Sequence, residues 1–380
     1  MCNILKLKYI FPIVVCLLLL PSFLLYTLVV SFENEFDEFY FGIDVAYADV
    51  DKIKKLVDQI SDYTNFFVIG STGISYDQDN LNQTIFYLVE QNLDYAVYTG
   101  SARWLFSINE ILALYEEKFV GLYYDDEHGG RQLDLNAISV ESADNYSDAA
   151  SQFVSSLVYR LNATYYRDKP YSYLVPLDFH LITSDYALYW FDYQAGYDVL
   201  LAQFGWNYSR QINIAQVRGA ATAMDRDWGA IIAWTYSEPP YVGSGEELFD
   251  DLVLAYENGA KYILVFDSNE AYTDTILREE HLAAMERFWK YTKDNPRPSN
   301  LLDGRVAFVL PKDWAYGFRG PDDKIWGLWE TDELASTISE DLGFLLEEYG
   351  SKLDVIYDDG LELDNIYKKY FFWNGTIITP

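Results

Sequence analysis

The stretch GLYYDDEHGG, residues 121–130, begins as a run of apolar and aromatic residues and then breaks into acidic residues and glycine. A second stretch, AIIAWTYSEPPY at residues 230–241, has the same form with proline in place of glycine. Short apolar runs of this kind are typical of buried parallel strands. In a barrel of parallel strands, the active site lies at the rim where the strands end. Glu127 and Glu238 are therefore predicted to face each other across one pocket.

Strand-like and helix-like patterns alternate on both sides of these two stretches. Strands are predicted at 39–47, 65–71, 94–100, 118–126, 186–193, 198–206, 228–236 and 260–268, and helices at 50–60, 80–92, 107–117, 147–161, 209–224, 246–259 and 278–295. Because a parallel crossover needs a dozen or more residues, either the helix between 186–193 and 198–206 has shrunk to a turn or the second of these segments is helical. Eight strands alternating with helices predict an α/β fold, a (β/α)8 barrel of the TIM type. A doubly wound open sheet is the alternative, and the lack of a glycine-rich phosphate fingerprint after the first strand disfavours it.

Pro296, Pro298 and Ser299 mark a boundary, beyond which a small C-terminal α/β appendage is predicted. Its strands are expected at 305–311, 353–359 and 374–380, and its helix at 333–350. The loop at 314–329 is rich in Gly, Trp and charged residues. Two interpretations are open: it folds over the barrel mouth, or it forms a tight structural turn. We expect three parts: residues 1–33, an N-terminal anchor or signal segment; 34–298, the barrel; and 299–380, the appendage.

Residues 9–31 contain no charged side chain, and Lys6 and Lys8 precede them. About twenty apolar residues suffice to cross a bilayer, and the lysines are expected to stay in the cytoplasm. No A-x-A-like cleavage site is evident before Glu33, which favours an uncleaved transmembrane helix over a secretory signal peptide. We therefore expect a single-pass protein of the cell membrane with its C-terminal part outside. The alternative is a protein secreted after cleavage.

The remaining composition is consistent with an extracellular glycoprotein that is strongly acidic. The only cysteines, Cys2 and Cys16, belong to the N-terminal segment, so the exported part has neither disulfides nor thiolate sites. N-glycosylation sequons begin at Asn82, Asn145, Asn162, Asn207 and Asn374. The formal net charge of −32 argues against a nucleic-acid partner, because phosphates would be repelled.

Paired carboxylates lined by Trp and Tyr are what glycoside hydrolysis requires. A carboxylate after strand four and a Glu after strand seven resemble the clan A arrangement of (β/α)8 glycoside hydrolases. The resemblance implies that Glu127 is the acid/base, that Glu238 is the nucleophile and that the reaction is retaining. This chain has Asp126 where clan A members carry Asn before the acid. Asn207, after strand six, is the candidate to bind a sugar hydroxyl instead.

Further candidates for substrate binding lie near the predicted strand ends. Asp44 would be costly to bury unpaired, so it is expected to face the pocket or to form a salt bridge, for example with Arg103. Asp192 and Asp267 are weaker candidates of the same kind. Arg319 belongs to the 314–329 loop. The aromatic residues expected either to stack on sugar rings or to pack in the core are Trp104, Trp190, Trp206, Trp234 and Tyr236.

The sequence thus predicts a membrane-anchored, carbohydrate-active hydrolase, a glycosidase on a TIM barrel, with a glycan or glycoconjugate as substrate and no cofactor. The alternative is a non-catalytic carbohydrate-binding or cell-envelope structural protein, in which residues 125–127 are a solvated loop or a helix cap and Glu238 is a rim residue. A metal-dependent hydrolase is a third possibility and would need His128 to converge with Asp125, Asp126 or Glu127.

Overall fold

The computed structural model describes residues 39–100, 116–135, 139–165, 179–298, 300–301, 303–320, 323–360 and 366–380. Its central feature is a closed barrel of eight strands in the order β1 to β8, and every strand is parallel to its neighbours. The predicted TIM-type barrel is confirmed. The strands are β1 (Tyr40–Val45), β2 (Phe66–Ile69), β3 (Asp94–Tyr98), β4 (Phe119–Tyr123), β5 (His180–Asp185), β6 (Val199–Phe204), β7 (Asp227–Ile232) and β8 (Tyr262–Asp267).

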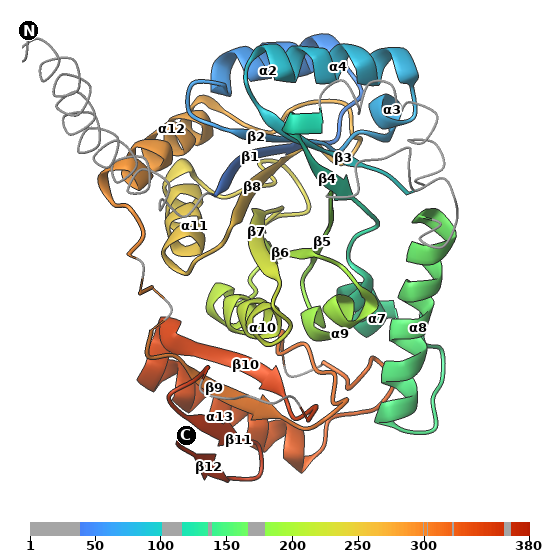
Figure 1. Ribbon diagram of the computed structural model, residues 1–380, viewed down its shortest axis with the longest axis vertical. Helices are drawn as coiled ribbons and strands as arrows, with labels where there is room; N and C mark the ends of the chain where they lie inside the picture. Colours follow the sequence, from blue (N-terminus) through green and yellow to red (C-terminus); the bar gives the residue numbers. More distant parts are fainter. Residues whose placement is uncertain are drawn as a thin grey trace, which may run out of the picture. The chain divides into compact units, whose positions relative to one another are not determined.

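Helices surround the barrel, as Figure 1 shows. In α2, Asp49 accepts a hydrogen bond from the Lys52 N–H at the N-terminus, and the buried residues recur with helical spacing at Ile53, Leu56, Val57 and Ile60. The helices are α2 (Val50–Ile60), α3 (Thr72–Ser75), α4 (Gln78–Glu90), α7 (His128–Leu135), α8 (Tyr146–Tyr165), α9 (Tyr189–Ala195), α10 (Arg210–Ala223), α11 (Gly245–Glu257) and α12 (Glu279–Asp294).

The fifth strand was predicted in the wrong place. It is formed by His180–Asp185, whereas the apolar run at 186–193 leads into the short helix α9. Every residue of this helix except Gln194 is buried, so its sequence lacks the polar face that marks a helix. The segment at 198–206 is a strand, and the numbering of strands four and seven is unchanged.

The barrel interior is filled by side chains at alternate strand positions. Tyr40, Phe66 and Tyr262 close one end, and the Tyr40 and Tyr262 rings stack with centroids 4.8 Å apart. Val68, Leu201 and Leu264 lie among the buried residues of the layer above. At the carboxyl ends of the strands, the alternation places polar side chains inward, at Asp44, Ser184 and Gln203. The polar end of the barrel is the end at which TIM-barrel active sites lie.

The C-terminal appendage contains a four-stranded sheet in the order β10-β9-β11-β12 and one helix, α13 (Glu333–Tyr349). The predicted strands β9 (Val306–Leu310) and β10 (Leu353–Tyr357) pair in parallel. The third predicted strand is reduced to β12 (Ile377–Ile378), which runs antiparallel to the short strand β11 (Tyr370–Phe372). The prediction missed β11, because three aromatic residues are too few to show alternation.

A buried ion pair joins the appendage to the barrel, and a second one within the appendage shares its carboxylate. Arg218 on α10 donates to Asp354 on β10 over 2.7 Å, and Arg305 donates to the other oxygen of the same carboxylate. Asp354 has no exposed surface. Residues 39–295 and 300–380 accordingly form one compact unit, and Figure 1 shows the appendage sheet beside α10. The predicted division between residues 298 and 299 stays a prediction about folding units.

The predicted membrane anchor, residues 1–33 with the apolar segment 9–31, lies outside the described residues. Within the described ranges, no helix combines the length and the apolar character needed to cross a membrane.

Candidate functional site

The carboxyl ends of β1 and β4 bring three acidic side chains to the mouth of the barrel. Asp44 is the next-to-last residue of β1, and Asp126 and Glu127 follow β4. Asp44 is only 3% exposed, and its Oδ1 atom has no hydrogen-bond partner. Burial, followed by the negative charge of Asp126, raises the pKa of Asp44, so Asp126 lies within electrostatic range of it. We call Asp44, Asp126 and Glu127 the mouth cluster.

The turn that carries Asp126 and Glu127 has a strained backbone. Asp125 and Glu127 have φ values of 40° and 62°, in the left-handed region that residues other than glycine rarely adopt. Neighbouring residues fix this conformation: the Glu127 N–H donates to the Ser184 carbonyl over 2.8 Å, and the Thr183 hydroxyl donates to the Asp125 carbonyl over 2.8 Å. Strain of this kind is concentrated at functional sites.

Asp185, the last residue of β5, fixes the next part of the same segment. Its carboxylate accepts hydrogen bonds from the N–H groups of Gly129 and Gly130 over 2.6 and 2.8 Å. These N–H groups belong to the first turn of α7, where a negative charge is favourable. The turn between β4 and α7 is thus held on both sides of Glu127.

A chain of hydrogen bonds positions Glu127. The Gln203 amide nitrogen donates to Glu127 Oε1 over 3.0 Å and to the Ser184 hydroxyl over 2.9 Å. The Tyr123 hydroxyl donates to the same Ser184 oxygen over 2.7 Å. Both N–H groups of the Gln203 amide are therefore used, and one of them fixes the orientation of Glu127.

Asp126 and Asp125 have opposite electrostatic surroundings. Burial, followed by the charge of Glu127, raises the pKa of Asp126 to about 7. Burial acts in the same direction on Asp125, but hydrogen bonds and charge from His128 and Arg160 outweigh it and lower the pKa of Asp125. His128 Nε2 lies 3.0 Å from Asp125 Oδ2. Near neutral pH, Asp126 is thus able to carry a proton while Asp125 is ionised.

A metal centre at this position finds no support among the described residues, in which no group of three or more His, Cys, Asp or Glu side chains is arranged to hold an ion. His128, which the metal hypothesis needed, is buried against Asp125. It supports the turn after β4.

Glu238 lies in a different environment from Glu127. It is exposed on the loop after β7, where its carbonyl accepts the Tyr241 N–H over 3.0 Å. Together with Trp206 and Tyr236, which are 42% and 47% exposed, it lines an open cavity of about 500 Å³. Asn207 is exposed and lines a neighbouring cavity of about 360 Å³. These four predicted residues form a rim between the ends of β6 and β7, which we call the aromatic rim.

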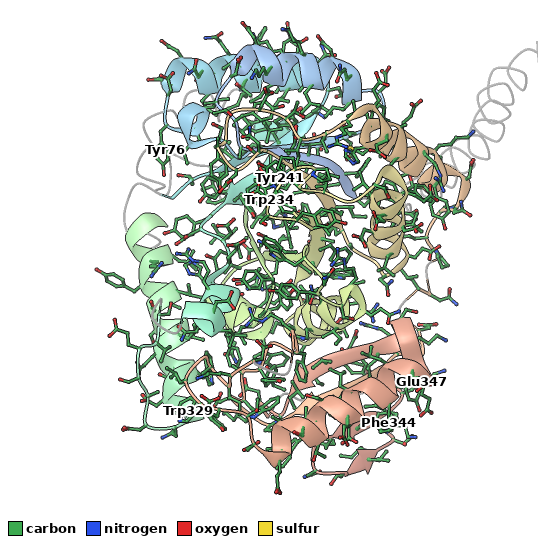
Figure 2. All side chains as sticks on the ribbon, turned by 180° about the vertical axis from the view of Figure 1, so that it is seen from behind. Tyr76, Trp234, Tyr241, Trp329, Phe344 and Glu347 are labelled. Atoms are coloured by element: carbon green, nitrogen blue, oxygen red, sulfur yellow. The ribbon has the colours of Figure 1, made fainter. Side chains whose placement is uncertain are left out.

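Trp234 extends this aromatic surface toward the barrel interior. Its ring centroid lies 5.1 Å from that of Tyr241 and 6.1 Å from that of Phe266, and its indole N–H donates to the Ser268 carbonyl over 3.0 Å. Figure 2 shows Trp234 and Tyr241 close together in the middle of the barrel. The indole is partly buried, and its orientation is fixed by these contacts.

Trp190 and Asp192 do not lie at a strand end, contrary to the prediction. Both are buried on α9, and Trp190 packs against Tyr357 of the appendage with centroids 5.2 Å apart. Burial, followed by the charge of Asp185, raises the pKa of Asp192 well above its usual range. Asp267, a weaker candidate, is fully buried and accepts hydrogen bonds from Thr275 and Ile276. These three residues are part of the packed structure.

Arg319 is held by two carboxylates and does not point freely into the mouth. Its guanidinium donates to Asp134 on α7 over 2.7 Å and to Asp323 within its own loop. Trp326 of the same loop is fully buried and contacts Phe191 with centroids 4.6 Å apart. The 314–329 loop is therefore a docking segment of the appendage, which favours the structural alternative. Trp104 lies outside the described residues.

The sequence analysis missed four polar residues of the mouth: Tyr98, Tyr123, Ser184 and Gln203. The charges of Asp126 and Asp44 act on both tyrosines and, together with burial, raise their pKa values. Each of the four lies at the last or next-to-last position of its strand. Placing β5 at 180–185 and extending the inward alternation to the strand ends would have found them.

No protein-family model and no curated protein matches this chain. Solved structures with the same barrel do: an endo-β-1,4-mannanase from Thermotoga petrophila has 10% identity over 72% of this chain and 82% of that chain, with a TM-score of 0.45. The pneumococcal virulence factor StrH, in a study of N-glycan recognition and hydrolysis, has 10% identity over 70% and 87%, with a TM-score of 0.41. Orotidine 5'-monophosphate decarboxylase from Methanocaldococcus jannaschii has 8% identity over 67% and 98%, with a TM-score of 0.34. At such identities these likenesses transfer no activity.

Proposed function

We propose that this protein is a glycoside hydrolase whose chemistry is carried by the mouth cluster. The observation that supports this most is the pairing, on one fixed turn, of Asp126, whose pKa is raised to about 7, with Glu127, which accepts a hydrogen bond from Gln203. Glycoside hydrolysis needs one carboxyl group that is protonated and one that is ionised. Two carboxyl groups in different surroundings meet this need.

The roles follow from these surroundings. Asp126 donates its proton to the glycosidic oxygen as the bond to the sugar carbon breaks. Glu127, held in orientation by Gln203, either stabilises the positive charge that develops on the sugar carbon or forms a bond to that carbon, and water then adds to the same carbon to complete the hydrolysis. This modifies the roles predicted from sequence, in which Glu127 was the acid and Glu238 the nucleophile. The retaining outcome stays a prediction, and NMR of the first anomer formed tests it.

The aromatic rim serves as the binding surface. Exposed rings such as Trp206 and Tyr236 offer flat apolar faces for sugars, and Glu238 beside them can accept hydrogen bonds from hydroxyl groups. We expect the substrate to be a chain of sugars, with one sugar on the rim and another in the mouth. Glu238 then contributes to affinity, and the chemical step belongs to the mouth.

A screen of the purified full-length chain against plant, bacterial and fungal polysaccharides, with reducing-end release as readout, tests the proposal. Asp126→Asn and Glu127→Gln are each expected to lower kcat by at least about 100-fold, as removal of a general acid does. Glu347→Gln is the matched control, because Glu347 is exposed on α13 of the appendage (Figure 2). Glycan binding without any turnover would overturn the proposal in favour of a non-catalytic carbohydrate-binding protein.

A further inference from the structure

Asp44 is a buried carboxyl group with an oxygen that no described residue contacts by a hydrogen bond. It lies on β1, across the barrel mouth from the β4 turn, is 3% exposed, and leaves Oδ1 without a hydrogen bond. The backbone of Gly70 approaches so closely that a side chain there would lie 2.1 Å from this oxygen. The Gly70 backbone therefore packs against Asp44, and a buried carboxylate oxygen without a hydrogen bond from the described residues is costly.

The charges around Asp44 are of one sign. Asp126 is the charged neighbour that acts on it, and Asp125, Asp185 and Glu127 add to the negative charge that acts on Asp126. On the β4 to β7 side of the mouth, described basic side chains already contact carboxylates. These pairs are Arg160 with Asp125, Arg210 with Asp251, and Arg319 with Asp134 and Asp323. Since these arginines are already paired, an anionic group entering the mouth would be repelled by Asp44, Asp126 and Glu127.

We propose that Asp44 binds the protonated amino group of the substrate, and that the substrate is therefore a polymer of free amino sugars. This inference rests on the proposed function and names its substrate class. An ammonium group has three N–H donors, which match the unpartnered Asp44 oxygen and the neighbouring hydroxyl groups of Tyr98 and Tyr123. Asp126 keeps its role as proton donor, since its burial and the charge of Glu127 are independent of Asp44.

The electrostatics of the empty mouth agree with this assignment. Burial and the charge of Asp126 raise the pKa of Asp44 well above its usual range, and no described basic side chain forms an ion pair with it. A bound ammonium would supply a compensating positive charge. A metal ion is disfavoured, because the described residues offer no set of three ligands for one. Neutral sugars would bring no positive charge to the Asp44 carboxyl group. N-acetylation would remove the positive charge of the amino group that we propose Asp44 binds.

Binding to the full-length Glu127→Gln variant separates this inference from turnover. The ligands are chitosan hexamer, its fully N-acetylated form, a neutral cellohexaose and oligogalacturonate, measured by isothermal calorimetry. We expect the chitosan hexamer to bind about 10- to 100-fold more tightly than the N-acetylated form, the range for hydrogen bonds to a charged group. Adding Asp44→Asn should abolish this preference. Asp51→Asn, an exposed aspartate at the start of α2, is the matched control and should keep it.

The outcomes distinguish the two proposals. A preference for the amine that Asp44→Asn removes supports the inference, whether or not any glycan is cleaved. Equal binding of the amine and N-acetyl forms, or an amine preference that survives Asp44→Asn, overturns it. Hydrolysis of neutral glycans with no amine preference would leave the hydrolase proposal standing and contradict this inference. Circular dichroism and thermal melting of Asp44→Asn establish that any loss of binding is not a loss of fold.

Discussion

Asp126 and Glu127 are neighbours in the chain, yet they are suited to opposite tasks. Burial and the adjacent negative charge favour the protonated form of Asp126 near neutral pH, while the Gln203 amide donates to Glu127. The assignment of acid and carboxylate roles thus depends on the environment of each group. A third carboxyl group, Asp125, is committed to His128 and Arg160 and supports the turn.

The raised pKa of Asp126 makes stability depend on pH. Between the unfolded-state pKa of about 3.9 and the folded-state value of about 7, the folded protein binds the extra proton, so the free energy of unfolding falls as pH rises. This group contributes at most about 1.4 kcal/mol per pH unit in that window. Asp126→Asn should remove the contribution and be more stable than the wild type at pH 8 but not at pH 4. Urea denaturation across this range measures it, with Asp51→Asn as control; equal slopes for variant and wild type would contradict the assignment.

Gln203 should matter for turnover through Glu127. Gln203→Leu removes the hydrogen bonds to Glu127 and Ser184, and a hydrogen bond to a charged group is worth about 1.5–3 kcal/mol. We expect kcat/KM to fall about 10- to 100-fold while the fold is kept. The control is Gln83→Leu on the exposed side of α4. Steady-state kinetics decide, and an unchanged kcat/KM in Gln203→Leu would mean that Glu127 needs no such support.

At the scale of the elements, the sequence was informative where its pattern was periodic. Helix α2 was predicted at its observed bounds, and strands four and seven were numbered correctly, because amphipathic spacing and apolar runs report burial on one or both faces. The run at 186–193 was wrongly predicted to be a strand, because α9 is buried between barrel and appendage and has no polar face. That error displaced β5, and with it Ser184, and moved Trp190 and Asp192 to the wrong end of an element.

The contact between α10 and β10 can be tested with two glycines. A β-carbon at Gly219 on α10 would lie 2.2 Å from the Val355 carbonyl oxygen, whereas one at Gly343 on α13 would meet nothing within 4 Å. Gly219→Ala should therefore destabilise by roughly 1–3 kcal/mol through overpacking. Gly343→Ala should stabilise by about 0.5–1 kcal/mol, because alanine is the better helix former. Chemical denaturation measures both; equal effects would show that the helix–strand approach is not tight.

At the scale of the whole molecule, the appendage completes the barrel structure around α7, α9 and α10. Trp190 and Arg319, both selected from sequence for their chemistry, contribute to this docking together with Trp326. Sequence identified the appendage and its α/β character. It did not show which aromatic residues would be buried in the interface between barrel and appendage, because such burial depends on contacts between residues far apart in the chain.

The buried ion pairs at this interface should be essential for stability. Asp354→Asn leaves Arg218 and Arg305 buried without a countercharge, and breaking a buried pair in this way costs about 3–5 kcal/mol. Asp359→Asn, which removes a more exposed pair with Lys312, should lower the melting temperature much less. Thermal unfolding compares them. A melting temperature unaffected by Asp354→Asn would contradict the view that barrel and appendage are stabilised as one unit.

The central claim is that glycosidic bonds are cleaved at the mouth cluster and not at the aromatic rim. The most direct measurement is the rate of reducing-end release, at saturating substrate, by Glu127→Gln and Glu238→Gln on the best glycan found. We predict that Glu127→Gln lowers kcat by at least about 100-fold, as loss of a catalytic carboxylate does, while Glu238→Gln raises KM and leaves kcat within a few-fold of wild type. A kcat lost in Glu238→Gln and retained in Glu127→Gln would contradict the account.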